Sequence, residues 1–215
     1  MSNIFSDFYA GISAIFLRYG AEVLQRTGEH LLLVGIAITI AILVSLPLGI
    51  LITRQKALRR PVLALANVLQ TIPSLALFGL LIPVVGIGAV PAIVALTLYS
   101  FLPIIRNTYT GITNVDPAVR EAGRGMGMTD WQLLTQVEIP LALGVILAGV
   151  RVATVIAIGI ATIAAAVGAG GLGVFIFRGI AVVNNQLILA GAIPAAAIAL
   201  IADSGIGWLE RRLTR

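Results

Sequence analysis

The amino-acid sequence predicts an all-α fold, that of a polytopic membrane protein with about five transmembrane helices and a short helix in a polar loop. Hydrophobic residues make up 59% of the 215 residues and charged residues only 11%, for a mean hydropathy of +1.07. This composition lies far outside the range of soluble globular proteins. The apolar residues also gather in runs of the ~20 residues that a helix needs to cross a hydrocarbon core of ~30 Å.

The first 28 residues are expected to form an interfacial or extracytoplasmic segment ahead of the membrane domain. No basic start precedes an apolar core and Asp7 interrupts the segment, so a cleavable signal peptide is not expected. Large apolar residues recur here at helical spacing, which predicts a helix that lies at the membrane interface or packs against the bundle. These residues are Ile4, Phe5, Phe8, Ile12, Ile15, Phe16 and Tyr19.

A single transmembrane domain is expected over residues 29–210, followed by a tail at 211–215. The first apolar run, residues 31–52, holds no charge over 22 positions. Residues 61–105 are equally uncharged but about twice as long as one span, so two helices are expected there. A turn between them is predicted at Pro83, Gly86, Gly88 and Pro91.

Two further runs supply the fourth and fifth spans. Residues 139–177 hold a single charge, Arg151, and are broken late by a glycine-rich stretch. Residues 187–208 are interrupted by Pro194 and Asp203. Small residues recur along the fourth span and predict close helix packing in the bundle core; they are Gly144, Ala148, Gly149, Ala153, Ala157, Ala161 and Ala165.

The basic residues predict the orientation of the chain, because cytoplasmic loops near span ends are enriched in Lys and Arg. With five spans, the segments after the first, third and fifth lie on one side of the membrane. They hold ten of the 14 basic residues, namely Arg54, Lys56, Arg59, Arg60, Arg106, Arg120, Arg124, Arg211, Arg212 and Arg215. The C-terminus is therefore expected in the cytoplasm and the N-terminus outside, and the net charge of +5 needs no nucleic-acid partner.

The sequence offers no constellation for catalysis or metal binding. The chain has no cysteine, which excludes disulfides and thiolate metal sites. Its one histidine, His30, stands beside Glu29 at the start of a span and is interpreted as a boundary residue rather than a ligand. No G-x-x-x-x-G-K-[ST] loop is present to cradle nucleotide phosphates.

A long polar loop between the third and fourth spans is the main candidate for function. Some thirty residues join Arg106 to the next apolar run, well beyond the usual connection between helices. Asp116 followed by Pro117 predicts a helix start, because the carboxylate can accept from free backbone N–H groups and proline suits the first turn. Either a solvated loop or a lever for a partner protein would fit these features.

A reversal and a second helix are predicted further along this loop. Thr129 with Gln132 matches a capping box, which restarts a helix toward the membrane. Three glycines precede it and make a continued helix costly, so a sharp turn is expected between the two helices; they are Gly123, Gly125 and Gly127.

The loop contains Glu121-Ala122-Gly123, then Gly127, then Val137-Glu138-Ile139-Pro140. It resembles the EAA loop of ABC-importer permeases, whose pattern is E-A-A, three residues, G, nine residues and I-x-L-P. Every spacing agrees. Glycine replaces the second alanine at Gly123, and Val137 and Ile139 replace other aliphatic residues of the pattern. Four more segments are similar to the osmoprotectant uptake permeases: QTIPSLAL at 70–77, LPIIRNTY at 102–109, GAGGLG at 168–173 and IFRG at 176–179.

The resemblance implies a type I ABC-importer permease in a prokaryotic inner membrane, with its coupling loop at about residues 116–140. Two permease subunits, alike or different, would form the pathway, and two cytoplasmic ATPase subunits would bind ATP and Mg and receive the short helix. An external solute-binding protein would deliver the solute, and this chain would itself hold no cofactor or metal. The positions implied in ATPase coupling are Asp116, Arg120, Glu121, Ala122, Gly123, Gly127 and Pro140.

Arg151 is the costliest residue of the spans, because a charge near the middle of a membrane helix is unfavourable by ~2.5–3.5 kcal/mol. One expectation is that it helps set a gate by pairing with Asp203 or with backbone carbonyls freed near Pro73 or Pro194. The other is that its side chain extends toward the cytoplasm, where water solvates the charge. The other polar candidates for the pathway are Thr71, Ser74, Asn107 and Thr154.

The resemblance favours quaternary amines such as glycine betaine, choline or carnitine as the solute. Aromatic cages hold such groups, and only 6% of this chain is aromatic, so a separate binding protein is expected to select the solute. A permease for an amino acid such as methionine would share the loop and the five-span core. A secondary transporter or channel would show charged pairs in several spans and an internal repeat; the sequence shows one intramembrane Arg, one Asp and no repeat.

Overall fold

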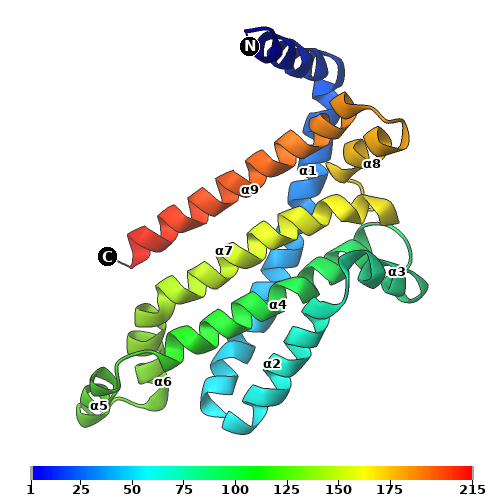
Figure 1. The fold of residues 1–215 in the computed structure, drawn as a ribbon. Coiled ribbons are helices and arrows are strands. Elements are labelled where there is room, and N and C mark those ends of the chain that lie inside the picture. Colours follow the sequence, from blue (N-terminus) through cyan, green and yellow to red (C-terminus); the bar gives the residue numbers. More distant parts are fainter. Residues whose placement is uncertain (1, 215) are drawn as a thin grey trace. The chain divides into compact units, whose positions relative to one another are not determined.

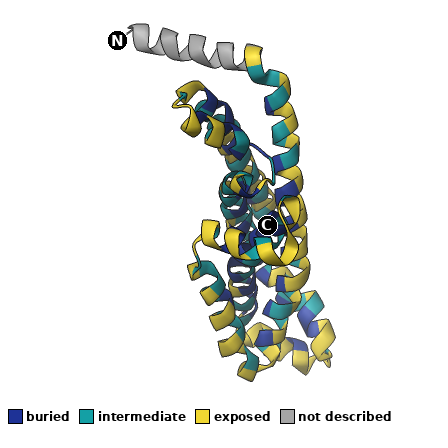
Figure 2. Ribbon diagram, turned by 90° about the vertical axis from the view of Figure 1, so that its right-hand side faces the viewer, coloured by how far each residue is buried: buried dark blue, intermediate teal, exposed yellow. Residues whose placement is uncertain are grey.

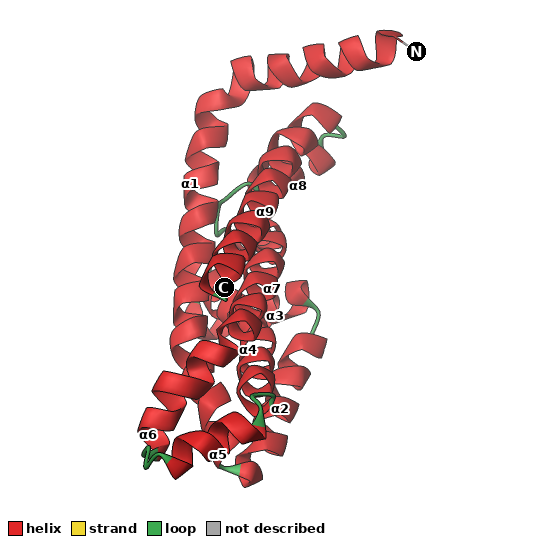
Figure 3. Cartoon of the chain, turned by 90° about the vertical axis from the view of Figure 1, so that its left-hand side faces the viewer, coloured by secondary structure: helices red, strands yellow, loops and turns green. Residues whose placement is uncertain are grey.

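A computed structural model describes the backbone of residues 2–214 and the side chains of residues 18–214. The predicted apolar pattern of the N-terminal segment therefore lies, except for Tyr19, outside the described side chains. Residues 2–214 contain helices and connecting loops without a strand (Figure 3). The all-α prediction is confirmed.

Eleven helical elements follow one another along the described chain (Figure 1). Nine are α-helices, one is a π-helical turn and one is a 3₁₀ turn. They are α1 (Ser2–Arg54), α2 (Lys56–Thr71), α3 (Ser74–Val85), α4 (Ala89–Thr113), α5 (Pro117–Gly125), α6 (Asp130–Leu133), the π-helical η1 (Leu134–Glu138), α7 (Ile139–Ile163), the 3₁₀ turn η2 (Ala164–Val167), α8 (Gly173–Ala181) and α9 (Asn185–Leu213).

Within the described residues, four stretches are long and apolar enough to cross a membrane: Arg18–Arg54, Ala89–Thr113, Asp130–Val167 and Asn185–Leu213. The pair α2 and α3 adds a fifth if it counts as one broken span. The sequence predicted one turn within residues 61–105, but the chain also breaks before α3. Pro73 takes φ −57° and ψ 134°, outside the helical region, and a residue that precedes proline is itself pushed out of that region.

The chain divides into two compact units. Unit 1 comprises Met1–Ala37, Ile72–Leu96 and Ile156–Ile201, and unit 2 comprises Ile38–Thr71, Thr97–Val155 and Ala202–Arg215. Buried, intermediate and exposed positions are interspersed along the helices of the part whose side chains are described (Figure 2). Each unit has its own core.

The core of unit 1 joins α1, α8 and α9. Its buried residues are Val23, Leu172, Phe175, Leu187, Ala190 and Ala195. Tyr19 packs edge-on against Phe175 with ring centroids 6.0 Å apart. The glycine-rich stretch before α8 turns sharply, because Gly170 and Gly171 take φ of 82° and 74°, a region open mainly to glycine.

His30 is buried in unit 1, and its Nε2 lies 3.1 Å from the carbonyl oxygen of Ile158. The neighbouring carboxylate of Glu29 accepts a hydrogen bond from the N–H of Gly171 at 2.9 Å. The boundary interpretation of His30 thus misses its role in packing. These contacts tie α1 to α7 and to the glycine-rich turn within this unit.

Among the described residues, the core of unit 2 includes two clusters, one of Ile52, Ala66, Leu102 and Ile105, the other of Ile112, Leu134, Ala142 and Ile146. Helices approach closely here at glycines. A Cβ added at Gly149 would lie 2.6 Å from Cβ of Asn107, and one added at Gly49 would lie 2.6 Å from Cβ of Thr108. The predicted core packing of the fourth span is confirmed at Gly149 and Ala153 in this unit.

Candidate coupling site

The short helix α5 begins as the sequence predicts. The Oδ1 atom of Asp116 accepts a hydrogen bond from the N–H of Ala118 at 2.8 Å, and Pro117 occupies the first turn. The carboxylate thereby satisfies one of the N–H groups that a helix start leaves without an intrahelical acceptor. Only Gly123 of α5 is buried, so most of this helix is accessible.

The reversal after α5 lies at Gly127, which takes φ 82°. Gly123 and Gly125 instead belong to α5, so the predicted turn is shorter than expected. Gly123 has a packing role, because a Cβ there would lie 2.8 Å from Cδ1 of Leu133. The close approach of α5 and α6 therefore requires a residue without a side chain at this position.

The predicted capping box is present at the start of α6. The hydroxyl of Thr129 accepts from the N–H of Gln132 at 3.3 Å, and Oε1 of Gln132 accepts from the N–H of Thr129 at 2.8 Å. The chain then continues through the π-helical turn into α7, where Pro140 is the second residue and is exposed. The loop is thus an ordered helix, turn and helix.

Two arginines hold the buried carboxylate of Glu138 at the end of η1. Only 1% of its side chain is exposed. Arg54, the last residue of α1, binds both carboxylate oxygens, and Nε of Arg120 in α5 lies 3.2 Å from Oε1. A second nitrogen of Arg120, Nη2, donates to the carbonyl oxygen of Ile112 in α4. These contacts fix α5 to the ends of α1 and α4.

Other residues of the loop are exposed, in contrast to the buried Glu138. Glu121 and Ala122 are exposed. Large apolar side chains are exposed as well, with 77% of Met126 and 71% of Trp131 accessible. A cleft of about 530 Å³ lies alongside, lined by Thr53, Arg54, Arg124, Asp130, Trp131 and Leu134. Exposed apolar patches rimmed by polar residues mark sites that bind proteins or membranes.

A second cleft of about 870 Å³ lies in unit 2 and is strongly basic. One face of α2 lines it with Lys56, Arg59, Arg60, Leu63, Ala64 and Asn67, facing Ile52, Thr53, Tyr109, Thr113 and Arg120. The guanidinium of Arg59 lies 4.6 Å from the ring centroid of Tyr109. Among the described residues, no carboxylate forms an ion pair with Lys56, Arg59 or Arg60.

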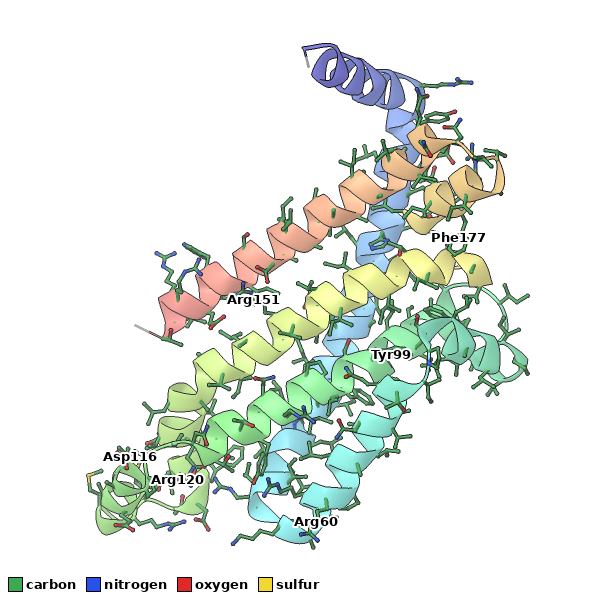
Figure 4. The ribbon with its side chains drawn as sticks, in the orientation of Figure 1. Arg60, Tyr99, Asp116, Arg120, Arg151 and Phe177 are labelled. Carbon is green, nitrogen blue, oxygen red and sulfur yellow. The ribbon has the colours of Figure 1, made fainter. Side chains whose placement is uncertain are left out.

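Arg151 pairs with Asp203, one of the partners expected for it. Its Nε and Nη2 donate to the two carboxylate oxygens at 2.6 and 2.7 Å, and its Nη1 lies 3.7 Å from Glu210. Figure 4 labels Arg151 on α7, from which it reaches α9. The side chains of Arg151 and Asp203 are 34% and 38% exposed, so the pair is only half-buried.

The other pathway candidates belong to both units. The hydroxyls of Thr71 and Thr154 donate to carbonyls of their own helices, and Nδ2 of Asn107 does the same to Pro103. Such back-bonding satisfies a polar side chain inside an apolar helix. Pro73 and Ser74 belong to unit 1, whereas Thr71, Asn107, Arg151, Thr154 and Asp203 belong to unit 2.

The sequence profile of a family described as the binding-protein-dependent transport system inner membrane component matches residues 45–215. The chain is 47% identical over 195 residues to the glycine betaine/carnitine/choline transport system permease protein OpuCB of Bacillus subtilis (strain 168), covering 91% of this chain and 90% of the relative. It is 51% identical over 204 residues to the glycine betaine/carnitine/choline transport system permease protein OpuCD of the same organism, covering 94% of this chain and 89% of that relative. This chain belongs to that family of inner membrane transport components.

A solved structure supports the fold of this permease. The chain resembles a subunit of the MetNI methionine ABC transporter, solved in inward-facing conformations, with a TM-score of 0.82 at 25% identity. The match covers 90% of this chain and 96% of the other. The predicted fold of a type I ABC-importer permease is confirmed.

Sequence reasoning missed two functional candidates in this permease. The loop motif includes Glu138 but predicts no role for it, and the distribution of basic residues predicts only the side of the membrane on which Arg54 lies. A usable signal was present, because an acid directly before a long apolar run needs a cationic partner. The sequence did not show which of the nearby arginines would supply it.

Proposed function

We propose that this chain is the membrane-spanning permease subunit of an ATP-driven importer for quaternary amines such as glycine betaine, choline or carnitine. The observation that carries this proposal is the similarity, at 47% and 51% identity over about nine-tenths of the chain, to permease proteins named for those solutes. The capped and exposed helix α5 supplies the means of coupling to an ATPase.

The working complex would contain two permease subunits, two cytoplasmic ATPase subunits and an external solute-binding protein. ATP and Mg would bind to the ATPases, and this chain would carry no catalytic site of its own. The membrane domain would span residues 29–210 with α5 and the C-terminal tail in the cytoplasm and residues 1–28 outside. The basic residues around the larger cleft support this orientation, because positive residues favour the cytoplasmic side.

Coupling would run through α5. Closure of the ATPase dimer would move this helix, and rocking of the attached helices would switch access from outside to inside. The exposed Glu121, Met126 and Trp131 would contact the ATPase, while the buried side of α5 holds it to the permease. The Arg151–Asp203 pair would help set the gate, because it joins α7 to α9.

Uptake of labelled glycine betaine at high external salt tests this proposal. Cells with and without the gene would be compared after deletion of other betaine systems, with choline and carnitine as parallel probes. Loss of saturable uptake of any of the three solutes is expected.

Methionine uptake would be measured in the same cells, because the resemblance to the MetNI transporter favours an amino acid as the second candidate. Loss of methionine uptake with all three amines unaffected would replace the proposed solute and keep the permease function. Purification from native membranes without any ATPase would instead refute an ATP-driven importer.

A further inference from the structure

Glu138 is the most completely buried carboxylate in the described part of the chain, and both of its oxygens have cationic partners. Arg54 binds both oxygens, and Arg120 approaches Oε1 at 3.2 Å. The two arginine side chains remain partly exposed, at 35% and 24%. The buried carboxylate of Glu138 is therefore paired with one arginine from α1 and one arginine from α5.

The three residues come from elements that are far apart in the sequence. Arg54 ends α1, Arg120 lies in the middle of α5, and Glu138 ends η1 and directly precedes α7. Arg120 also donates to the carbonyl oxygen of Ile112 near the end of α4. One carboxylate and one guanidinium thus connect α5 to three transmembrane helices within unit 2.

Because Glu138 is buried, breaking its ion pairs costs more free energy than breaking an ion pair at a surface. An exposed ion pair contributes little and is readily exchanged for water. A buried carboxylate that loses one of two cationic partners loses part of its compensation, and a charge in a buried site is costly unless it is well paired. Displacement of α5 away from Glu138 is therefore resisted, and α5 has few other anchors, because only Gly123 of its nine residues is buried.

We propose that Glu138 is a positioning residue that makes α5, the end of α1 and the start of α7 move together when the ATPase subunits close. This inference rests on the proposed function, in which α5 docks on the ATPase. Through Arg120, the carboxylate converts a displacement of the short helix into a displacement of the spans. Without it, ATPase closure moves α5 while the membrane helices lag behind.

The test is the number of glycine betaine molecules imported per ATP hydrolysed by the complete complex in proteoliposomes with its binding protein. Glu138→Gln keeps the shape of the side chain and removes its charge. A fall of about fivefold or more in this ratio is expected, because coupling between distant sites in proteins commonly corresponds to factors of about 5–150. Continued ATP hydrolysis by the assembled complex separates this outcome from a loss of folding.

Glu22→Gln is the matched control, because Glu22 also binds an arginine, Arg178 at 3.0 Å, but is half-buried and lies in unit 1. It is expected to keep the wild-type ratio. Arg120→Gln and the double variant with Glu138→Gln should show the same loss as Glu138→Gln alone, since the ion pair between Arg120 and Glu138 is lost in all three. Arg120→Lys should give a ratio between those of Arg120→Gln and the wild type, because lysine keeps the positive charge that pairs with Glu138.

A wild-type ratio in the assembled Glu138→Gln complex would overturn the inference. If that complex does not assemble, Arg120→Gln decides, because Arg54 still neutralises the carboxylate there; an unchanged ratio in Arg120→Gln overturns the inference equally. Absence of betaine-dependent ATP hydrolysis in the wild-type complex would instead refute glycine betaine as the solute, and the same ratio would then be measured with choline, carnitine or methionine.

Discussion

Replacing Gly149 with alanine should destabilise the permease through a single added methyl group. Gly149 lies in α7 where this helix crosses α4 in unit 2. The new Cβ would lie 2.6 Å from Cβ of Asn107 and 2.8 Å from the carbonyl oxygen of Pro103. Neither atom can rotate away, because one is attached directly to the backbone and the other belongs to it.

The expected magnitude follows from these two distances. Carbon atoms pack best at ~3.5–4.0 Å, so α4 and α7 must separate by about 1 Å to admit the methyl group. Overpacking of this kind costs about 1–3 kcal/mol, and the gain from removing a glycine inside a helix offsets about 0.5–1 kcal/mol of it. The difference is a net loss of about 0–2.5 kcal/mol, centred on about 1 kcal/mol, and a loss of about 1 kcal/mol lowers the Tm by about 2–4 °C for a chain of this size.

Thermal unfolding of the full chain in detergent micelles, followed by circular dichroism, would measure this effect. Gly159→Ala is the matched control on the same helix, because nothing lies within 4 Å of a Cβ placed there. Its Tm should stay equal to that of the wild type or rise slightly. A Gly149→Ala chain as stable as the wild type would refute the close approach of α4 and α7.

Three further predictions concern the coupling loop and the gate. Glu121→Arg should abolish uptake by weakening ATPase docking while the exposed position leaves the fold intact; normal uptake by a normally expressed variant would contradict the loop assignment. Asp116→Ala removes the cap of α5 and should cost about 0.5–2 kcal/mol locally, measured as faster hydrogen exchange at the Ala118 amide, with unchanged exchange counting against the cap. Arg151→Gln removes the cation that pairs with Asp203 and should lower the rate of uptake, whereas full transport at normal expression would exclude a gating role for the pair.

Features that depend on neighbouring residues were predicted well from the sequence. The cap of Asp116 on α5 and the capping box of Thr129 and Gln132 are both present, because each involves atoms within three residues of one another. The break at Pro73 is also local, but the hydropathy of residues 61–105 hides it. Proline alone does not mark the break, because Pro47, Pro61, Pro83, Pro103 and Pro194 all lie inside helices. Only the backbone angles of Pro73 show that the helix stops there.

Contacts between distant segments could not be predicted in this way. His30 was interpreted as a boundary residue, yet it is buried against the Ile158 carbonyl, 128 positions away. Asp203 was one of several partners considered for Arg151, and only the structure selects it. Each of these contacts depends on which helix faces lie together.

Composition and the lengths of the apolar runs alone determined that this chain is an all-α membrane protein, because a bilayer demands about twenty apolar residues per span. The spacing of the loop motif indicated where a partner would couple. Only the tertiary structure decided that Arg54 and Arg120 share the carboxylate of Glu138. A buried charge requires a partner of opposite sign, but several arginines could have met that requirement, and packing of α1, α5 and η1 determines which of them does.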